Sequence, residues 1–173
     1  MPELPEMFDV VDEHDQVIGQ APRTEVHARN LLHRAVHVFV FNSAGELLLH
    51  RRSAHKDQYP LCYTSSASGH VGAGETYDEA APRELAEELG LHSPLERLCK
   101  LPAGPETAWE HTVLYRTTTD TEPCCDPEEI ESAAFCPFEK VLALLAENPD
   151  EFSPPFRQLL QWYRSKGGRG HEG

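Results

Sequence analysis

The chain has 173 residues, of which 39% are hydrophobic and 25% are charged, and this length and composition predict one globular domain rather than two. Its 29 acidic and 15 basic side chains give a net charge of -14, which disfavours binding to nucleic acid polymers and to anionic membrane surfaces. A phosphorylated ligand would therefore need a bound cation between itself and the acidic protein.

The ends and the cysteines indicate the compartment. Residues 1–6 lack the basic region and apolar run of a secretory signal, and no stretch of about 18 apolar residues occurs in the chain. Five cysteines without CxxC spacing suit neither a disulfide framework nor a zinc site, so we expect free thiols. These features predict a cytoplasmic protein.

The first half of the chain predicts mainly strands. They cover residues 8–13, 16–20, 33–41, 46–52 and 63–69, with a brief helix from Thr24 and a loop at 53–62. The run at 33–41 is apolar on both faces after Arg34, which is typical of a strand buried in the middle of a sheet.

The second half predicts three helices and three further strands. Thr76 and Glu79 form a capping box that opens a helix over 76–89, and Gly90 ends it. Strands follow at 95–101, 111–118 and 130–135, and apolar residues at helical spacing predict two closing helices, near 138–145 and 156–163. This order predicts an α/β (α+β) fold, with a mixed sheet between helical layers in a single domain over 1–166 and a disordered tail at 167–173.

Three glutamates, Glu84, Glu87 and Glu88, are spaced at i, i+3 and i+4, so on a helix their carboxylates share one face. Like charges at this spacing each cost about 0.2–0.5 kcal/mol unless something compensates. The cluster is typical either of a solvated acidic face or of a site for a hard divalent cation such as Mg²⁺, which prefers oxygen ligands.

The residues around these glutamates form a longer pattern: Gly69, five residues, Glu75, seven residues, and then the run from Arg83 to Leu91. This pattern resembles the signature of the Nudix hydrolases at every fixed position. The resemblance implies an αβα sandwich in which Glu84, Glu87 and Glu88, with the carbonyl of Gly69, bind Mg²⁺ or Mn²⁺. It also implies a small-molecule substrate, a nucleoside diphosphate linked to another group X, that is cleaved by attack of water at phosphorus.

Other residues are assigned roles around this pattern. Arg83 is expected to orient carboxylates, and the family pattern pairs it with Glu75. We expect the general base to be Glu87 or Glu88, or else Glu110, which either resembles in position a functional glutamate of a Nudix-fold isomerase or is an exposed carboxylate at a strand end. Arg51, Arg52 and Lys56 are candidate phosphate ligands, or else surface cations of an acidic protein. Pro82 lies inside the predicted helix, where it removes a hydrogen bond and predicts a kink or a loose first turn.

The segment from Tyr63 to His70 resembles isopentenyl diphosphate isomerase, a Nudix-fold enzyme. The isomerases carry a catalytic cysteine where this chain has Ser68, and a serine hydroxyl is a far weaker acid than a thiol. The isomerases also bind metal through histidines in places that resemble His33 and His70, with a partner near His27 that is displaced by one residue. Lone histidines are more often satisfied structural residues. Diphosphate hydrolysis is the preferred prediction, with an isomerase-like enzyme and a catalytically silent nucleotide-binding module as alternatives, and the sequence leaves open whether the chain forms a homodimer.

Overall fold

The computed structural model describes residues 4–166, which form nine strands, four α-helices and two short 3-10 helices. The strands are β1 (Met7–Val11), β2 (Val17–Pro22), β3 (His33–Phe41), β4 (Glu46–Arg52), β5 (Tyr63–Thr64), β6 (Ala67–His70), β7 (Glu96–Leu101), β8 (Glu110–Thr118) and β9 (Ile130–Pro137). The helices are α1 (Arg23–Arg29), α2 (Tyr77–Leu89), η1 (Pro105–Thr107), α3 (Phe138–Glu147), η2 (Pro149–Glu151) and α4 (Pro154–Ser165). The predicted tail at 167–173 lies outside the described residues.

Seven strands form the central sheet, in the order β5-β4-β3-β8-β7, with β6 paired to β3 and β9 paired to β4. The β3–β8 pair is parallel and the other pairs are antiparallel, which confirms the predicted mixed sheet. Strands β3 and β4 share only the pair Phe41 and Leu47, and β6 then takes the edge of β3 over residues 35–38. The sheet therefore divides where β4 diverges from β3.

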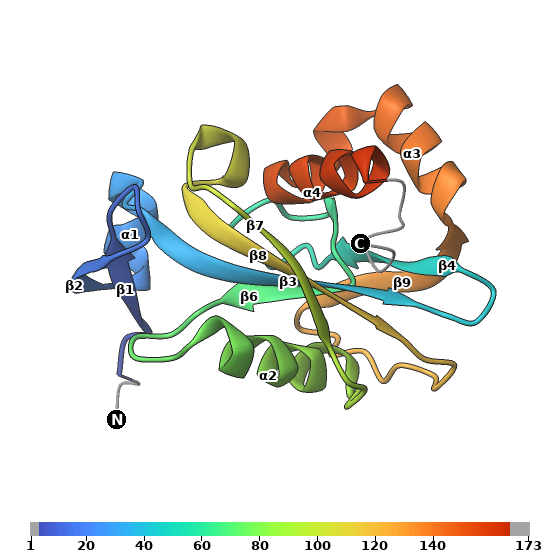
Figure 1. The fold of residues 1–173 in the computed structure, drawn as a ribbon, viewed down its shortest axis with the longest axis horizontal. Helices are drawn as coiled ribbons and strands as arrows, with labels where there is room; N and C mark the ends of the chain where they lie inside the picture. The colour runs from blue at the N-terminus through green and yellow to red at the C-terminus, as the bar shows by residue number, and fades with distance from the viewer. Residues whose placement is uncertain (1–3, 167–173) are drawn as a thin grey trace.

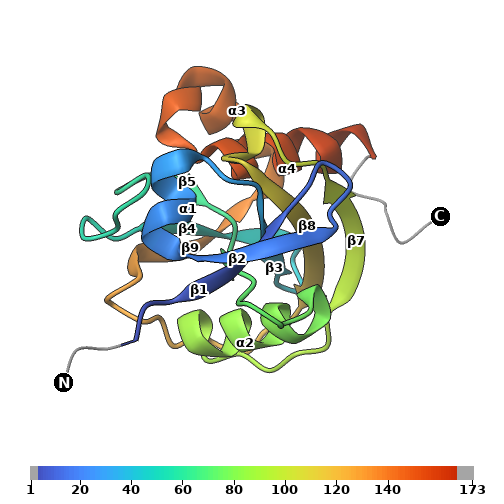
Figure 2. The same ribbon diagram turned by 90° about the vertical axis from the view of Figure 1, so that its left-hand side faces the viewer.

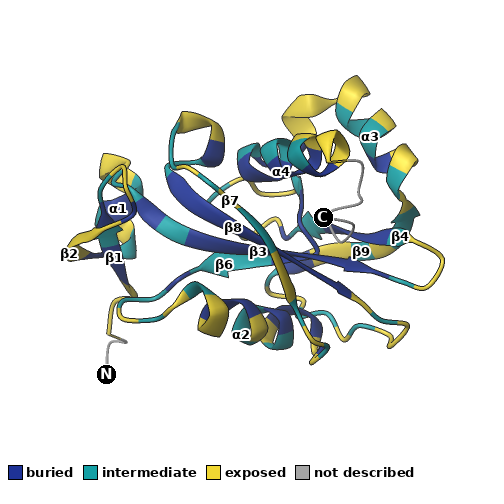
Figure 3. Ribbon diagram, viewed as in Figure 1, coloured by how far each residue is buried: buried dark blue, intermediate teal, exposed yellow. Residues whose placement is uncertain are grey.

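Helices cover both faces of the sheet, as the αβα prediction requires (Figure 1). Alternate residues of β3 separate the two cores: Val36, Val38 and Val40 pack in the cluster that contains the buried side of α2, and Phe39 and Phe41 pack in the cluster that contains α4. Figure 3 shows β3 and β8 buried through most of their length, whereas the outer side of α2 is exposed. The central strand is buried on both faces because each face has a helical layer.

A hairpin of β1 and β2, followed by α1, lies at one end of the sheet (Figure 2). Phe8 and Val26 are buried in a small core of their own. Asp15, in the hairpin turn, accepts hydrogen bonds from Arg34 (2.7 Å), Tyr77 (2.8 Å) and Lys100 (2.8 Å). These bonds hold the hairpin against β3, α2 and β7, and so fix the position of α1.

The single strand predicted over 63–69 is two strands, interrupted at Ser65 and Ser66. The Ser66 hydroxyl accepts from the Val40 amide (3.0 Å) and donates to the Leu48 carbonyl (2.7 Å), so a side chain bridges β3 and β4 where they separate. The other predicted elements appear within a few residues of their expected bounds. None of the described helices is long and apolar enough to cross a membrane.

Candidate metal and substrate site

A cleft of about 590 Å³ opens where the sheet divides, and residues of β3, β4, β6, β8 and α2 line it. It contains every residue that the sequence assigned to the site except Arg51. Carboxylates outnumber cations on its walls. The acidic residues are Glu6, Glu75, Glu84, Glu87, Glu88, Glu110 and Glu129, and the basic ones are Arg23, Arg52, Lys56 and Arg83.

The three glutamates of α2 project into this cleft from one helix face, as their spacing predicts. Glu88 is 5% exposed, and its carboxylate accepts a hydrogen bond from the Ser68 amide (3.2 Å). Burial raises the pKa of Glu88 well above its usual range, and the neighbouring Glu84 contributes to the shift. Burial also raises the pKa of Glu84. A divalent cation would offset the repulsion between these two carboxylates, because it places positive charge beside them.

Arg83 joins the glutamates to the loop that precedes α2. Its guanidinium donates to Glu75 through Nε (2.7 Å) and Nη2 (2.8 Å), and through Nη1 to Glu84 (2.7 Å) and Glu87 (3.3 Å). The paired bonds to Glu75 are the bidentate geometry that fixes a planar guanidinium in orientation. The geometry supports the predicted orienting role of Arg83 and its pairing with Glu75.

Pro82 does not interrupt α2, which runs from Tyr77 to Leu89. The first turn is closed by its cap, so the loose first turn predicted from Pro82 is not seen. Proline at this position lacks the amide that would donate to the Asp78 carbonyl, but the capping box of Thr76 and Glu79 satisfies amides of the first turn. The Arg83–Glu75 contact is therefore preserved.

Gly69 brings β6 against α2. A Cβ at this position would overlap the carboxylate group of Glu84, so the close approach requires glycine. The backbone of Gly69 thus lies beside a predicted metal ligand, which fits the role expected of its carbonyl. Glu84, Glu87, Glu88 and the Gly69 carbonyl offer the oxygen ligands that Mg²⁺ or Mn²⁺ prefers.

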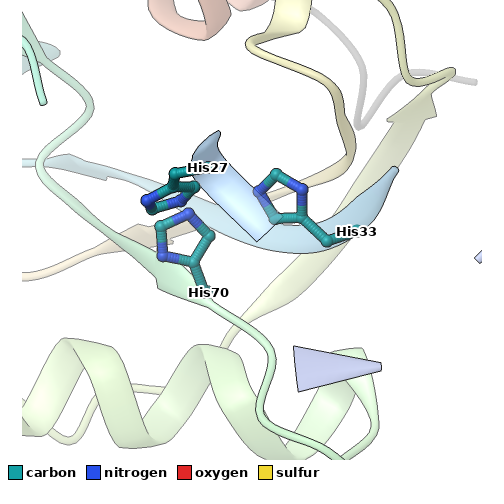
Figure 4. Close-up of side chains that lie close together, drawn as sticks. All are labelled: His27, His33 and His70. Carbon is teal, nitrogen blue, oxygen red and sulfur yellow. The ribbon is translucent and has the colours of Figure 1, made fainter. Parts of the chain in front are cut away.

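A second cluster of potential ligands lies on the other face of the sheet. His27, His33 and His70 each offer one ring nitrogen, and these atoms lie within 4.8 Å of one another. Figure 4 shows the three imidazoles turned toward one another from α1, β3 and β6. Burial lowers the pKa of His27 to about 4 and also lowers the pKa of His70, so both rings are neutral and suited to metal binding at neutral pH.

The bonding of these histidines bears on whether they are structural residues or ligands. The Nε2 atoms of His27, His33 and His70 are buried without a hydrogen-bond partner among the described residues. Nδ1 of His33 lies 2.8 Å from the Leu31 carbonyl, which can only accept, so Nδ1 carries a proton. Nε2 is then the nitrogen that faces the cluster, an arrangement typical of a metal ligand oriented through its other nitrogen.

Glu110, at the start of β8, adjoins the histidine cluster. Its Oε2 lies 3.1 Å from Nε2 of His70 and 3.7 Å from Nε2 of His33. Burial alone would raise the pKa of Glu110, but the imidazoles of His33, His37 and His70 hold it well below its usual range. Glu110 is therefore an ionised carboxylate that can join the three imidazoles as a fourth ligand or accept a proton.

The three predicted phosphate ligands differ in position. Arg52 and Lys56 line the cleft, whereas Arg51 lies on the opposite face of β4 and donates to the Leu61 carbonyl (3.0 Å). Lys56 pairs with Glu129 (2.6 Å), but Arg52 makes no ion pair within the described part of the chain and donates only to the Gln58 carbonyl (3.0 Å). Arg52 is thus the cation most available to an anionic ligand.

Sequence reasoning missed Arg23, His37 and His50, which also line the cleft. Nδ1 of His50 lies 3.0 Å from the Ser66 carbonyl and 4.0 Å from Glu88, and burial lowers the pKa of His50 to about 4. Of these three, only His50 could have been found from the sequence, because the alternation of β4 places it on the same face as Leu48 and Arg52, toward α2.

Comparison with known proteins agrees with the fold. The NUDIX domain model matches residues 31–163. An uncharacterized Nudix hydrolase of Streptomyces coelicolor is 48% identical over 97% of this chain and 95% of its own length. Isopentenyl-diphosphate Delta-isomerase 2 of Photorhabdus laumondii is 32% identical over 91% of this chain and 92% of its own length. The crystal structure of DR0079 from Deinococcus radiodurans has a TM-score of 0.80 and 30% identity, over 90% of this chain and 98% of that one. The chain therefore belongs to the Nudix family.

Proposed function

We propose that this chain is a metal-dependent Nudix hydrolase that cleaves the diphosphate bond of a nucleoside diphosphate linked to another group. The observation that carries this proposal is the set of glutamates on α2, clamped by Arg83 and Glu75 against the close-packed Gly69. Family membership and the complete sequence pattern support the same reaction. The family alone leaves the nucleoside and the second group undefined.

The position of each residue in the cleft indicates its role in this reaction. Glu84, Glu87, Glu88 and the Gly69 carbonyl would hold Mg²⁺ or Mn²⁺, which neutralises diphosphate oxygens and lowers the pKa of a bound water. Arg83 keeps the glutamates in orientation. Arg52 and Lys56 face the cleft from β4 and the following loop, where they can contact phosphate oxygens.

The proton acceptor is a carboxylate of the same cleft. Glu87 is the most exposed of the three predicted metal ligands of α2, with a side-chain exposure of 59%, so it is accessible to water. Glu110 lies on the other side of β6 and is ionised, as a base must be. Both remain candidates for the general base, together with Glu88.

A second candidate is an isomerase-like reaction on isopentenyl diphosphate. The observation that favours it is the cluster of His27, His33 and His70 beside Glu110, together with the similarity to a protein named as an isomerase. Ser68 argues against it, because a hydroxyl cannot readily exchange the proton that a thiol can. We therefore rank the hydrolase first.

A product assay separates these functions. The full chain is incubated with Mg²⁺ or Mn²⁺ and, in turn, with nucleoside di- and triphosphates, dinucleotides, nucleotide sugars and isopentenyl diphosphate, and products are read by phosphorus NMR. The hydrolase is supported if one class of diphosphate is cleaved and the variant Glu87→Gln is inactive. Isomerisation without cleavage establishes the second candidate, and nucleotide binding without turnover indicates a silent module.

A further inference from the structure

His37 lies between the two sets of ligands and has no part in the proposed function. It is on β3, opposite Ser68 in the pairing of β3 with β6, and it lines the cleft although it is only 4% exposed. A buried imidazole needs partners for both ring nitrogens, because each unsatisfied polar atom costs about 1–3 kcal/mol. Each of its two nitrogens faces one side chain, Ser65 or Glu110.

The first partner is Ser65. Its hydroxyl lies 2.8 Å from Nδ1 of His37, and the Ser65 residue is fully buried. This is the only hydrogen bond of the Ser65 side chain among the residues that the structure describes. A serine hydroxyl has one proton, so it either donates to Nδ1 or accepts from it.

The second partner is Glu110. Its two oxygens are used differently: Oε2 faces His33 and His70, whereas Oε1 is buried without a hydrogen-bond partner in the described range 4–166. Nε2 of His37 lies 3.8 Å from Oε1. If Nε2 carries a proton, this contact is attractive because a carboxylate oxygen accepts hydrogen bonds, whereas a lone pair on Nε2 would face the lone pairs of that oxygen.

We propose that Ser65 and His37 are positioning residues for Glu110. The Ser65 hydroxyl donates to Nδ1 of His37, which places the ring proton on Nε2 and directs that N–H at Oε1 of Glu110. A movement of about 0.8 Å brings this pair to hydrogen-bond distance. Oε1 is thereby held by His37 and Oε2 is turned toward the histidine cluster, so Glu110 is fixed in a single orientation. The consequence for turnover rests on the proposed function, but the hydrogen-bond arrangement does not.

The arrangement is tested first without activity. In the full chain labelled with ¹⁵N-histidine, two-bond proton–nitrogen correlations report which nitrogen of each neutral ring is protonated, and the signals of His37 are assigned by their loss in His37→Gln. We expect the proton on Nε2 in the unsubstituted protein and a loss of that preference in Ser65→Ala. Ser66→Ala is the matched control, because this neighbouring buried hydroxyl bonds only to Val40 and Leu48 and should leave His37 unchanged. A proton on Nδ1 of His37 in the unsubstituted protein overturns the proposal, whether or not hydrolysis is found.

The functional consequence is tested with two amide variants. His37→Gln places an N–H close to the position of Nε2, whereas His37→Asn places one nearer to Nδ1. We expect His37→Asn to lower kcat about tenfold or more with KM nearly unchanged, because a loss of this size is typical when a supporting contact is removed. We expect His37→Gln to retain most of the rate. Equal losses in both variants, or a change confined to KM, would show that His37 only fills space and would overturn the positioning role.

Discussion

The substitution Gly69→Ala tests whether the close packing of β6 on α2 sets the position of the metal ligand Glu84. An added Cβ would overlap the carboxyl carbon and both oxygens of Glu84, of which Oε2 is the farthest at 2.5 Å, whereas non-bonded heavy atoms settle about 3.5 Å apart, so the carboxylate must move by more than about 1 Å. Because the displaced group is the end of a flexible side chain, we expect the free energy of unfolding to fall by only about 1 kcal/mol, the low end of overpacking costs.

The metal site should lose more than the fold does. The shift moves Glu84 away from Nη1 of Arg83, now 2.7 Å distant, and a disturbed ligand support typically costs about 10–100-fold in metal affinity. Calorimetric titration with Mn²⁺ measures the affinity, and urea unfolding measures stability. Gly72→Ala is the matched control, because its Cβ would make only an ordinary 3.6 Å contact with Glu75. Equal metal affinity in Gly69→Ala and the unsubstituted chain would refute the argument.

Three further predictions concern single side chains of the cleft. Glu88→Gln should raise the Tm of the metal-free protein at neutral pH while abolishing metal-dependent turnover. The pKa of Glu88 in the folded protein lies above its unfolded value, so the contribution of Glu88 to stability is complete at low pH and is lost as pH rises through the folded pKa. An unchanged Tm in thermal melts would contradict this. Glu87→Gln should abolish metal-dependent turnover with little change in unfolding by urea, because Glu87 is exposed, and a near-normal rate would show that it is not a metal ligand. Ser68→Ala should leave the rate of hydrolysis largely intact, since the Ser68 contact to Glu88 is through its backbone amide, and complete loss in the product assay would assign the hydroxyl a role.

The carboxylate side of the cleft was predictable because its residues are close together in the sequence. Glu84, Glu87 and Glu88 lie within five residues of one helix, so helical periodicity alone places them together, and Thr76 and Gly90 mark the ends of that helix. The two central strands were predictable for a similar reason, since 33–41 is a largely apolar run and a short turn joins it to 46–52.

The histidine side was not predictable from periodicity, because its members come from three elements. His27 depends on where α1 ends, His33 on the start of β3, and His70 on the end of β6. The C-cap of α1, Asn30, has a φ of 52°, and this left-handed residue ends the helix between His27 and His33, both of which reach the cluster. The prediction that Arg51 lines the cleft was wrong for a simpler reason. Adjacent residues of a strand point to opposite faces, so Arg51 and Arg52 cannot line the same wall of the cleft.

Strand β6 connects the two sets of ligands, and this has a consequence for how they act. The Ser68 amide holds Glu88, Gly69 packs against Glu84, and the carbonyl of His70 accepts from Arg83 (3.2 Å) while its ring enters the histidine cluster. Three consecutive residues therefore fix the carboxylates of α2 and the imidazoles on the opposite face relative to one another. Any displacement of β6 changes both sets together, because alternate side chains of one short strand serve opposite faces. The position of β6, which pairs with β3 over residues 35–38, thus affects the geometry of both ligand sets.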